Sequence, residues 1–378
     1  MPDSILLAGG YGIVGTQLAA MLSKRHPNYR LIIGGRSFER AQMLASTLPN
    51  ASAITLNTDD SDPLENAQET PHLVVSLTND SGDKLLSSCL RRNIPYLDIT
   101  RWTERVRHAV AVLPALQSTS SLTSPVVFAS SWMAAVAATL ARGASMDMVT
   151  DAITIDVLYG MNDKAGPNSA EYMDRLELPF EVMEGGLRKQ KKSFTDGRLA
   201  HFQELGDVAV YRFDAPDQLT LPAITGANSV STRIAFSSVM ATRLLKMLVR
   251  TGIWRAISGD QFTSLRRAIL YNPGTGDHHR IAIEVVGRES DSSDVYRRME
   301  VNDPEGQTHL TAVGALIQVD RILGLNGHIA ARAGAQYAEA ETDPALLRST
   351  LEEFGVTVLD FHSRSGGYPH KNSPRQHS

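Results

Sequence analysis

The chain of 378 residues has a single cysteine, Cys89, so it cannot form an internal disulfide. This excludes a disulfide-stapled secreted scaffold and leads us to expect a reducing, cytoplasmic location. The chain also lacks an uninterrupted apolar run of the about 18 to 20 residues that a spanning helix needs. The longest candidate, residues 126–141, is broken by Ser130, Ser131 and Thr139. No basic region precedes a hydrophobic core at the N-terminus, so neither a signal peptide nor a membrane partner is expected.

The sequence also lacks a large excess of charge of either sign. Lysine and arginine together number 37 and aspartate and glutamate 41, which gives a formal net charge of −4. No basic stripe stands out, so we expect no nucleic-acid partner. Hydrophobic residues (42%) and charged residues (21%) are close to the globular average, which excludes wholesale disorder and fibrous repeats. At roughly 150 residues per domain, the length indicates two or three domains.

The first 130 residues alternate between short apolar runs and stretches with helical spacing. In the first such stretch, Val14, Leu18 and Met21 lie three and four positions apart. The expected strands are residues 4–8, 31–34, 53–56, 73–77, 96–99 and 126–129. This alternation predicts an α/β domain with a Rossmann-type, doubly wound parallel sheet and right-handed crossovers.

The pattern changes after about residue 150. Apolar residues alternate along 152–159, and the runs 280–286 and 295–301 are joined by a polar turn without a helix, so these two should pair antiparallel. The other expected elements are a strand at 208–213, helices at 235–249 and 310–323, and a loop within 160–206. Together they predict a second, α+β domain.

These patterns divide the chain into four parts. We expect a Rossmann domain at 1–130, an α+β domain at 131–325, a C-terminal segment at 326–362 that packs back on the first domain, and a disordered tail at 363–378. The strands of the second part have no obvious partner domain. A symmetric homodimer that covers their sheet surface or edge is therefore expected.

A complete GxGxxG motif follows the first expected strand and opens the first expected helix. It consists of Gly10, Tyr11, Gly12, Ile13, Val14 and Gly15. Gly10 allows a tight turn, Gly12 lets the backbone approach a pyrophosphate, and Gly15 lets the helix sit close to the strand. The free N–H groups of the helix N-terminus suit the phosphates. In this context the motif predicts a dinucleotide site.

The end of the second expected strand indicates which dinucleotide binds. Sites for NAD place an acidic residue about 20 residues beyond the motif, where it binds the ribose 2′-hydroxyl. Here that position holds Arg36 and Ser37, and the first carboxylate is Glu39 inside the next helix. A guanidinium pairs well with a 2′-phosphate, so NADP is the expected cofactor.

Several segments resemble the saccharopine dehydrogenase-like family. They are the run 8–15, Gly35-Arg36-Ser37, the strand 96–100 and the segment 159–167 with its Asn162-Asp163 pair. The resemblance implies a Rossmann domain, an α+β domain for substrate and dimer contacts, and nicotinamide-dependent chemistry at carbon–nitrogen bonds. After the sixth strand the family often has a turn with glycine and proline. This chain has residues 129–133, Ala-Ser-Ser-Trp-Met, which changes the wall beside the nicotinamide.

Polar residues at two strand ends are further candidates. Thr78 and Asn79 follow the fourth strand and border the crevice where a cofactor ribose lies, although Asn79 could instead cap the next helix. Asp98 lies in an otherwise apolar strand, where an unpaired carboxylate would cost several kcal/mol. It is our candidate catalytic residue, holding a substrate nitrogen or accepting a proton. Arg101 is close enough in sequence to be its structural partner instead.

The remaining site predictions concern the substrate. Arg101, Tyr159, Asn162 and Arg233 are candidates for holding a small-molecule substrate, with arginine suited to a carboxylate. No hydrolase arrangement or metal-ligand spacing stands out, and the adjacent His278 and His279 should point to opposite faces of a strand, so no metal is expected.

The combined prediction is an NADP-dependent oxidoreductase. It transfers a hydride between NADPH and the C=N bond of an amino-acid-like substrate, an imine and its secondary amine. Two alternatives remain open. One is an NADPH-dependent reductase of a carbonyl or enone on a lipid-like substrate, with a wide apolar pocket. The other is a catalytically silent dinucleotide-binding protein.

Overall fold

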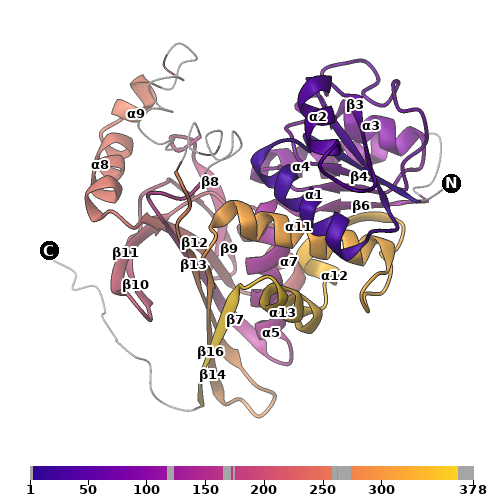
Figure 1. The fold of residues 1–378 in the computed structure, drawn as a ribbon. Helices are drawn as coiled ribbons and strands as arrows, with labels where there is room; N and C mark the ends of the chain where they lie inside the picture. Colours follow the sequence, from indigo (N-terminus) through magenta and orange to yellow (C-terminus); the bar gives the residue numbers. More distant parts are fainter. Residues whose placement is uncertain are drawn as a thin grey trace, which may run out of the picture.

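The computed structural model describes residues 3–116, 123–164, 172, 175–257, 262 and 274–364. It contains two seven-stranded sheets in neighbouring domains, one in indigo and purple and one in magenta to yellow in Figure 1. The predicted segment 165–167 and residues 365–378 of the predicted tail lie outside the described residues. No helix of the described part is long and apolar enough to cross a membrane.

The first sheet is parallel throughout, in the order β15-β6-β5-β4-β1-β2-β3. Its first six strands are β1 (Ser4–Ala8), β2 (Arg30–Gly35), β3 (Ala51–Thr55), β4 (Leu73–Ser76), β5 (Tyr96–Asp98) and β6 (Pro125–Phe128). The helices between them are α1 (Ile13–Arg25), α2 (Phe38–Ala45), α3 (Lys84–Arg91) and α4 (Thr103–Leu116). The order reverses between β1 and β4, as in a doubly wound sheet, and this confirms the predicted Rossmann-type α/β fold.

The second sheet is mixed, in the order β10-β11-β12-β7-β13-β14-β16. Its strands are β7 (Val149–Tyr159), β10 (Arg198–Phe202), β11 (Gly206–Arg212), β12 (Ser229–Phe236), β13 (His279–Arg288), β14 (Asp294–Asp303) and β16 (Thr357–Arg364). β12 runs parallel to β7, while β13 and β14 form the expected antiparallel pair. The sheet's helices are η1 (Met133–Ala138), α5 (Thr139–Ser145), α7 (Asp217–Thr225), α8 (Val239–Arg250) and α9 (Ile253–Ala256).

Two expectations for this domain were wrong. Residues 235–236 end β12, so the helix expected from 235 begins at Val239, where Ser238 caps it by accepting from Ala241 N. The segment 160–206 contains β10 and a second hairpin, β8 (Phe180–Glu184) with β9 (Leu187–Lys191). The sequence of this hairpin lacks a clear apolar alternation. Its charged residues pair across the strands instead of forming an apolar face, as Lys189 does with Glu184 at 3.1 Å.

The chain after the second sheet belongs to both domains. Helix α11 (Gln307–Leu323) is buried from end to end and packs against α1. β15 (Gly334–Tyr337) then joins the first sheet beside β6, and β16 joins the second sheet beside β14. The linking helices are α12 (Ala338–Glu341) and α13 (Pro344–Glu353). The segment 326–362 therefore contributes to each sheet, and the first two residues of the predicted tail end β16.

Candidate functional site

The glycine motif forms a tightly packed turn between β1 and α1. A Cβ atom on Gly10 would lie 2.9 Å from the Leu7 carbonyl oxygen, and one on Gly15 would lie 2.5 Å from the carbonyl oxygen of Gly10. Gly9, with φ +85°, makes the turn itself. Any side chain at position 10 or 15 would therefore push the helix away from the strand.

The N-terminus of α1 is free of side chains that would occupy it. Gly12 is the N-cap residue, it offers no side-chain acceptor, and the first turn has no acidic residue. The first N–H groups of a helix have no partner within the helix, and they carry its partial positive charge. The turn of Gly12, Ile13 and Val14 therefore fits the pyrophosphate of a dinucleotide.

Tyr11 joins this turn to the end of β2. Its ring packs so closely on Gly35 that a Cβ there would overlap it, and its hydroxyl accepts a hydrogen bond from Ser37 N at 3.1 Å. The Arg40 guanidinium lies 4.5 Å from the centre of the same ring. These contacts fix the end of β2 beside the glycine turn.

Arg36 and Arg40 supply the positive charge at this end of the site. Arg36 is exposed directly after β2. The Ser37 hydroxyl caps α2 by accepting from Arg40 N and donates to the Glu39 carboxylate at 2.8 Å. The Ser37 hydroxyl is thus already engaged, and the residues best placed for a 2′-phosphate are Arg36 and Arg40.

Thr78 and Asn79 adjoin the glycine turn where β4 ends. A Cβ on Gly9 would lie 3.0 Å from Thr78 Cβ, so Thr78 borders the turn. The carbonyl of Asn79 accepts from the Thr58 hydroxyl at 3.1 Å. The next residue, Asp80, stabilises the start of α3. Its carboxylate accepts hydrogen bonds from the backbone N–H groups of Lys84 and Leu86.

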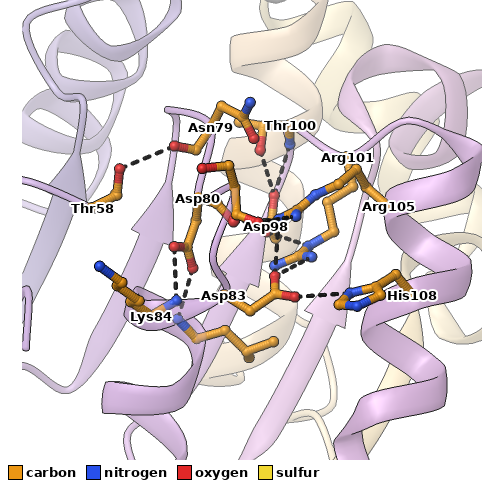
Figure 2. A network of polar contacts seen from close by, with 12 residues as sticks. Thr58, Asn79, Asp80, Asp83, Lys84, Asp98, Thr100, Arg101, Arg105 and His108 are labelled. Carbon is orange, nitrogen blue, oxygen red and sulfur yellow. Dashed lines mark hydrogen bonds and ion pairs between the residues drawn. The ribbon is translucent and has the colours of Figure 1, made fainter. Parts of the chain in front are cut away.

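Asp98 ends β5 in a buried ion-pair network, shown in Figure 2. Its side chain is 1% exposed and accepts four hydrogen bonds, from the Tyr96 hydroxyl, from the Thr100 amide and hydroxyl, and from Arg101 Nε at 2.7 Å. Arg101 also donates to Asp83 at 2.6 Å. The contacts are those of a carboxylate that positions the segment after β5, and the catalytic role of Asp98 stays a prediction.

The same network ties α3 to α4. Asp83, which precedes α3 with φ +53°, accepts from Arg105 at 2.9 Å and contacts His108 Nδ1 at 3.1 Å. Arg105 also donates to the carbonyl of Asp80. The guanidinium of Arg101 is thus shared between Asp98 and Asp83, while its Nη2 has no partner within the described residues.

In the second domain, two aromatic rings contact a buried histidine and a third packs on one of them. His279 begins β13, is fully buried, and lies with its ring centre 4.7 Å from that of Trp132 and 5.0 Å from that of Tyr159. Phe236 packs on Tyr159 at 5.9 Å. Within the described residues, neither ring nitrogen of His279 has a hydrogen-bond partner. We call these four residues the aromatic pocket.

Asp163 adds a carboxyl group to the aromatic pocket. Its Oδ2 lies 3.9 Å from His279 Nδ1 and accepts from Gln307 N at 2.9 Å, while its buried Oδ1 has no partner in the described part of the chain. Burial, with Asp277 and Asp303 nearby, raises the pKa of Asp163 to about 7. Burial lowers the pKa of His279 to about 3. Both groups are therefore held in or near their neutral forms at neutral pH.

The N-terminus of α11 joins the aromatic pocket to the glycine turn. Gln17, in the second turn of α1, donates to the Thr308 hydroxyl at 3.3 Å. Ser131, in the turn after β6, contacts the Thr311 hydroxyl at 2.8 Å. Ser130 and Ser131 both have left-handed backbones, with φ of +38° and +61°, and this turn directs Trp132 toward His279. The structure therefore brings the two halves of the site together around one helix end.

The predicted substrate residues divide between two locations. Tyr159 lies in the aromatic pocket, and Asn162 lies next to Asp163, with its N–H donating to Asp277. Arg233 lies on the opposite face of the second sheet. Ile234 and Phe236 enter the core, so Arg233 points the other way, where its Nε donates to the carbonyl of Asp196 at 3.1 Å.

Sequence reasoning missed the pairing of Trp132 with His279. The two residues are far apart in the sequence, and no local pattern marks either of them as part of a site. The opposite orientation expected for the adjacent histidines was the available signal, since His278 contacts Asn302 while His279 enters the pocket.

Comparison with known proteins identifies the first domain. Residues 5–124 match the model of the saccharopine dehydrogenase NADP binding domain. This part of the chain is therefore similar to the NADP binding domain of the saccharopine dehydrogenase family. The match makes the domain a nicotinamide dinucleotide-binding one and supports an NAD(P)-dependent oxidoreductase. No curated protein sequence matches the chain.

Solved structures of similar fold include two dehydrogenases. Saccharopine dehydrogenase (L-Glu forming) from Saccharomyces cerevisiae aligns over 96% of this chain and 100% of its own, with 10% identity and a TM-score of 0.66. Amine dehydrogenase from Mycobacterium smegmatis aligns over 90% of this chain and 96% of its own, with 11% identity and a TM-score of 0.48. The alignment with the yeast enzyme shows that the two chains share a fold along nearly their whole length.

We predict that Arg36→Asp weakens NADPH binding by about 1.5–3 kcal/mol, because a repelled phosphate replaces a paired one. NADH has no such phosphate and should bind nearly unchanged. Titration of both cofactors against wild type and variant measures this, with Arg332→Asp, an exposed residue between α11 and β15, as the control. Equal affinity of the wild type for NADH and NADPH would contradict the prediction.

We predict that Asp98→Asn lowers the free energy of unfolding by about 3–5 kcal/mol, since it leaves the buried Arg101 without one of its carboxylates. Asp360→Asn, which breaks a surface pair with Arg348, should cost less than about 1 kcal/mol. Urea denaturation of both variants provides the comparison. Unchanged stability of Asp98→Asn would show that the charge of Asp98 is held for another purpose.

Proposed function

We propose that this protein is an NADP-dependent oxidoreductase that transfers a hydride at a carbon–nitrogen bond of a small amine. The observation that carries the proposal is the aromatic pocket with its partnerless buried polar atoms, joined through α11 to the dinucleotide turn. Buried polar groups normally have partners, and those that lack one mark places where a ligand supplies them. The bound dinucleotide would provide or accept the hydride.

The chemistry of the aromatic pocket suits nitrogen. Aromatic faces attract a cation, and a buried carboxyl group beside them neutralises it. Reduction of C=N to CH–NH adds a hydride to carbon and a proton to nitrogen. Asp163, with a pKa of about 7, can hold that proton at neutral pH and release it to the nitrogen. His279 and Trp132 would orient the nitrogen and exclude water.

The two arginines first assigned to a substrate carboxylate are engaged elsewhere. Arg101 is bound to Asp98 and Asp83, and Arg233 lies on the far face of the second sheet. The proposal therefore assigns residues only to the amine portion of the substrate, which Tyr159 and Asn162 would contact. The buried carboxyl group of Asp163 also favours this proposal over a lipid-like enone, for which an apolar pocket would suffice.

We predict that the purified protein oxidises NADPH when offered mixtures of aldehydes or 2-oxo acids with primary amines, which form imines in solution. The loss of NADPH absorbance measures the rate, with each carbonyl compound alone as the control. Turnover of long-chain enones in place of imines would favour the lipid-like alternative. NADPH binding without turnover of any compound would favour a silent binding protein.

We predict that the imine-reduction rate falls above about pH 7, as Asp163 loses the proton that it donates. Asp163→Asn should lower the rate roughly 10²–10⁴-fold and remove this pH dependence. Asp207→Asn, which removes an exposed carboxylate of β11 that pairs with His201, is the control and should retain both.

Unfolding measurements test the protonation of Asp163 without any substrate. A carboxyl group whose pKa is raised on folding stabilises the fold below its ordinary pKa, and that contribution disappears as the pH rises through about 7. The wild type should therefore lose stability, relative to Asp163→Asn, between about pH 4 and pH 7. Parallel stability curves would show that Asp163 titrates normally.

A further inference from the structure

Helices α8 and α9 form an arm that stands away from both sheets, in salmon in Figure 1. The inner side of α8 is anchored by Leu245 in the core and by Thr242, whose hydroxyl accepts a hydrogen bond from Phe236 N at 3.0 Å. Lys246 lies over the Tyr211 ring at 4.2 Å. The outer side of α8 has no such contacts within the described residues.

The outer side of the arm is apolar. Met240, Leu244 and Met247 lie one turn apart on α8, at 77%, 49% and 49% exposure, and Val239 beside them is 59% exposed. Ile253 of α9 continues the row at 46%. Single exposed apolar residues are ordinary on protein surfaces, whereas a contiguous row of five marks a surface that binds something.

The charge of the arm is all of one sign. Residues 239–257 contain four basic residues and no acidic residue, in a chain whose formal net charge is −4. Arg243 and Arg250, seven positions apart, are both exposed along one flank of the Met240–Met247 row. An apolar row flanked by exposed basic residues is the pattern of a helix that lies at the surface of an anionic membrane.

A second copy of the chain fits this row less well. A stable interface buries about 800 Å² per partner, some 20–30 residues on each side. The arm offers five apolar side chains with two arginines along one flank, where a protein partner would have to bury their charge. On a bilayer, the arginines reach the headgroups while their stems cover the apolar row.

We propose that the α8–α9 arm binds the surface of anionic lipid membranes, with Met240, Leu244 and Met247 in the outer acyl layer and Arg243 and Arg250 at the headgroups. At 12 residues, α8 is about 18 Å long and cannot cross a hydrocarbon core of about 30 Å, so it lies flat. This is contact with a surface and does not depend on the proposed oxidoreductase function.

Flotation of the full chain with vesicles tests the proposal. The vesicles are phosphatidylcholine alone or equal parts of phosphatidylcholine and phosphatidylglycerol. The wild type should float with the anionic vesicles, and high salt should weaken the binding. Each of Arg243→Gln and Arg250→Gln should reduce the partition coefficient about fivefold. The triple variant Met240→Ser/Leu244→Ser/Met247→Ser should abolish binding.

Matched controls lie on the same domain but away from the arm. Leu199→Ser, on the exposed side of β10, and Arg188→Gln, on β9, should bind vesicles as the wild type does. Urea denaturation shows whether each variant still folds. Absence of binding to anionic vesicles would overturn the proposal, and so would equal loss in the control variants. A dimer in light scattering that the triple variant converts to a monomer, without vesicle binding by the wild type, would assign the row to a second copy.

Discussion

The structure depends above all on the burial of α11. One side of this helix, with Leu310, Val313 and Ile317, belongs to the core of the second sheet, and the other, with Leu316 and Val319, belongs to the core of the first. A helix that is apolar all round must be covered all round. The two domains therefore cannot separate without exposing it, and its N-terminus is held between the glycine turn and the aromatic pocket.

Polar contacts fix the orientation of α11 about its axis, which its hydrophobic burial alone does not determine. Asp320, fully buried on α11, contacts Arg25 and His26 at the end of α1, at 3.3 and 2.6 Å. At the other end of the helix, Thr308 meets Gln17 and Gln307 N meets Asp163. Hydrophobic packing has no direction, while these bonds have one, so they determine which side chains of α11 face the cleft.

The sequence predicts those parts of the arrangement in which the role of a residue depends on its neighbours in the chain. The glycine motif is such a part, because Gly10 and Gly15 are required by a turn of six residues. The alternation of strands and helices in the first domain is another. The parallel pairing of β12 with β7 is not, since about 70 residues separate the partner strands. The face of β12 on which Arg233 lies therefore does not follow from the sequence near it.

Asp98 shows a different limit of sequence reasoning. A carboxylate in an apolar strand demands a partner or a function, and both interpretations follow equally from the sequence. Only the three-dimensional contacts reveal that Arg101 is shared with Asp83, a residue that precedes α3. The network holds the ends of β4 and β5 in place beside the glycine turn. The contacts within the network explain how Asp98 and Arg101 can be buried, and the catalytic role of Asp98 stays a prediction.

The aromatic pocket uses burial in the opposite way. In the network of Asp98, carboxylates are buried against the Arg101 guanidinium, whereas Asp163 and His279 are buried without a cationic partner among the described residues. Burial disfavours the charged form of each, so it raises the pKa of the acid and lowers that of the base. An acid that keeps its proton near pH 7, beside a neutral imidazole 3.9 Å away, is ready to give the proton to an entering nitrogen. The low polarity that makes this pair costly to bury is therefore the property that would make it useful.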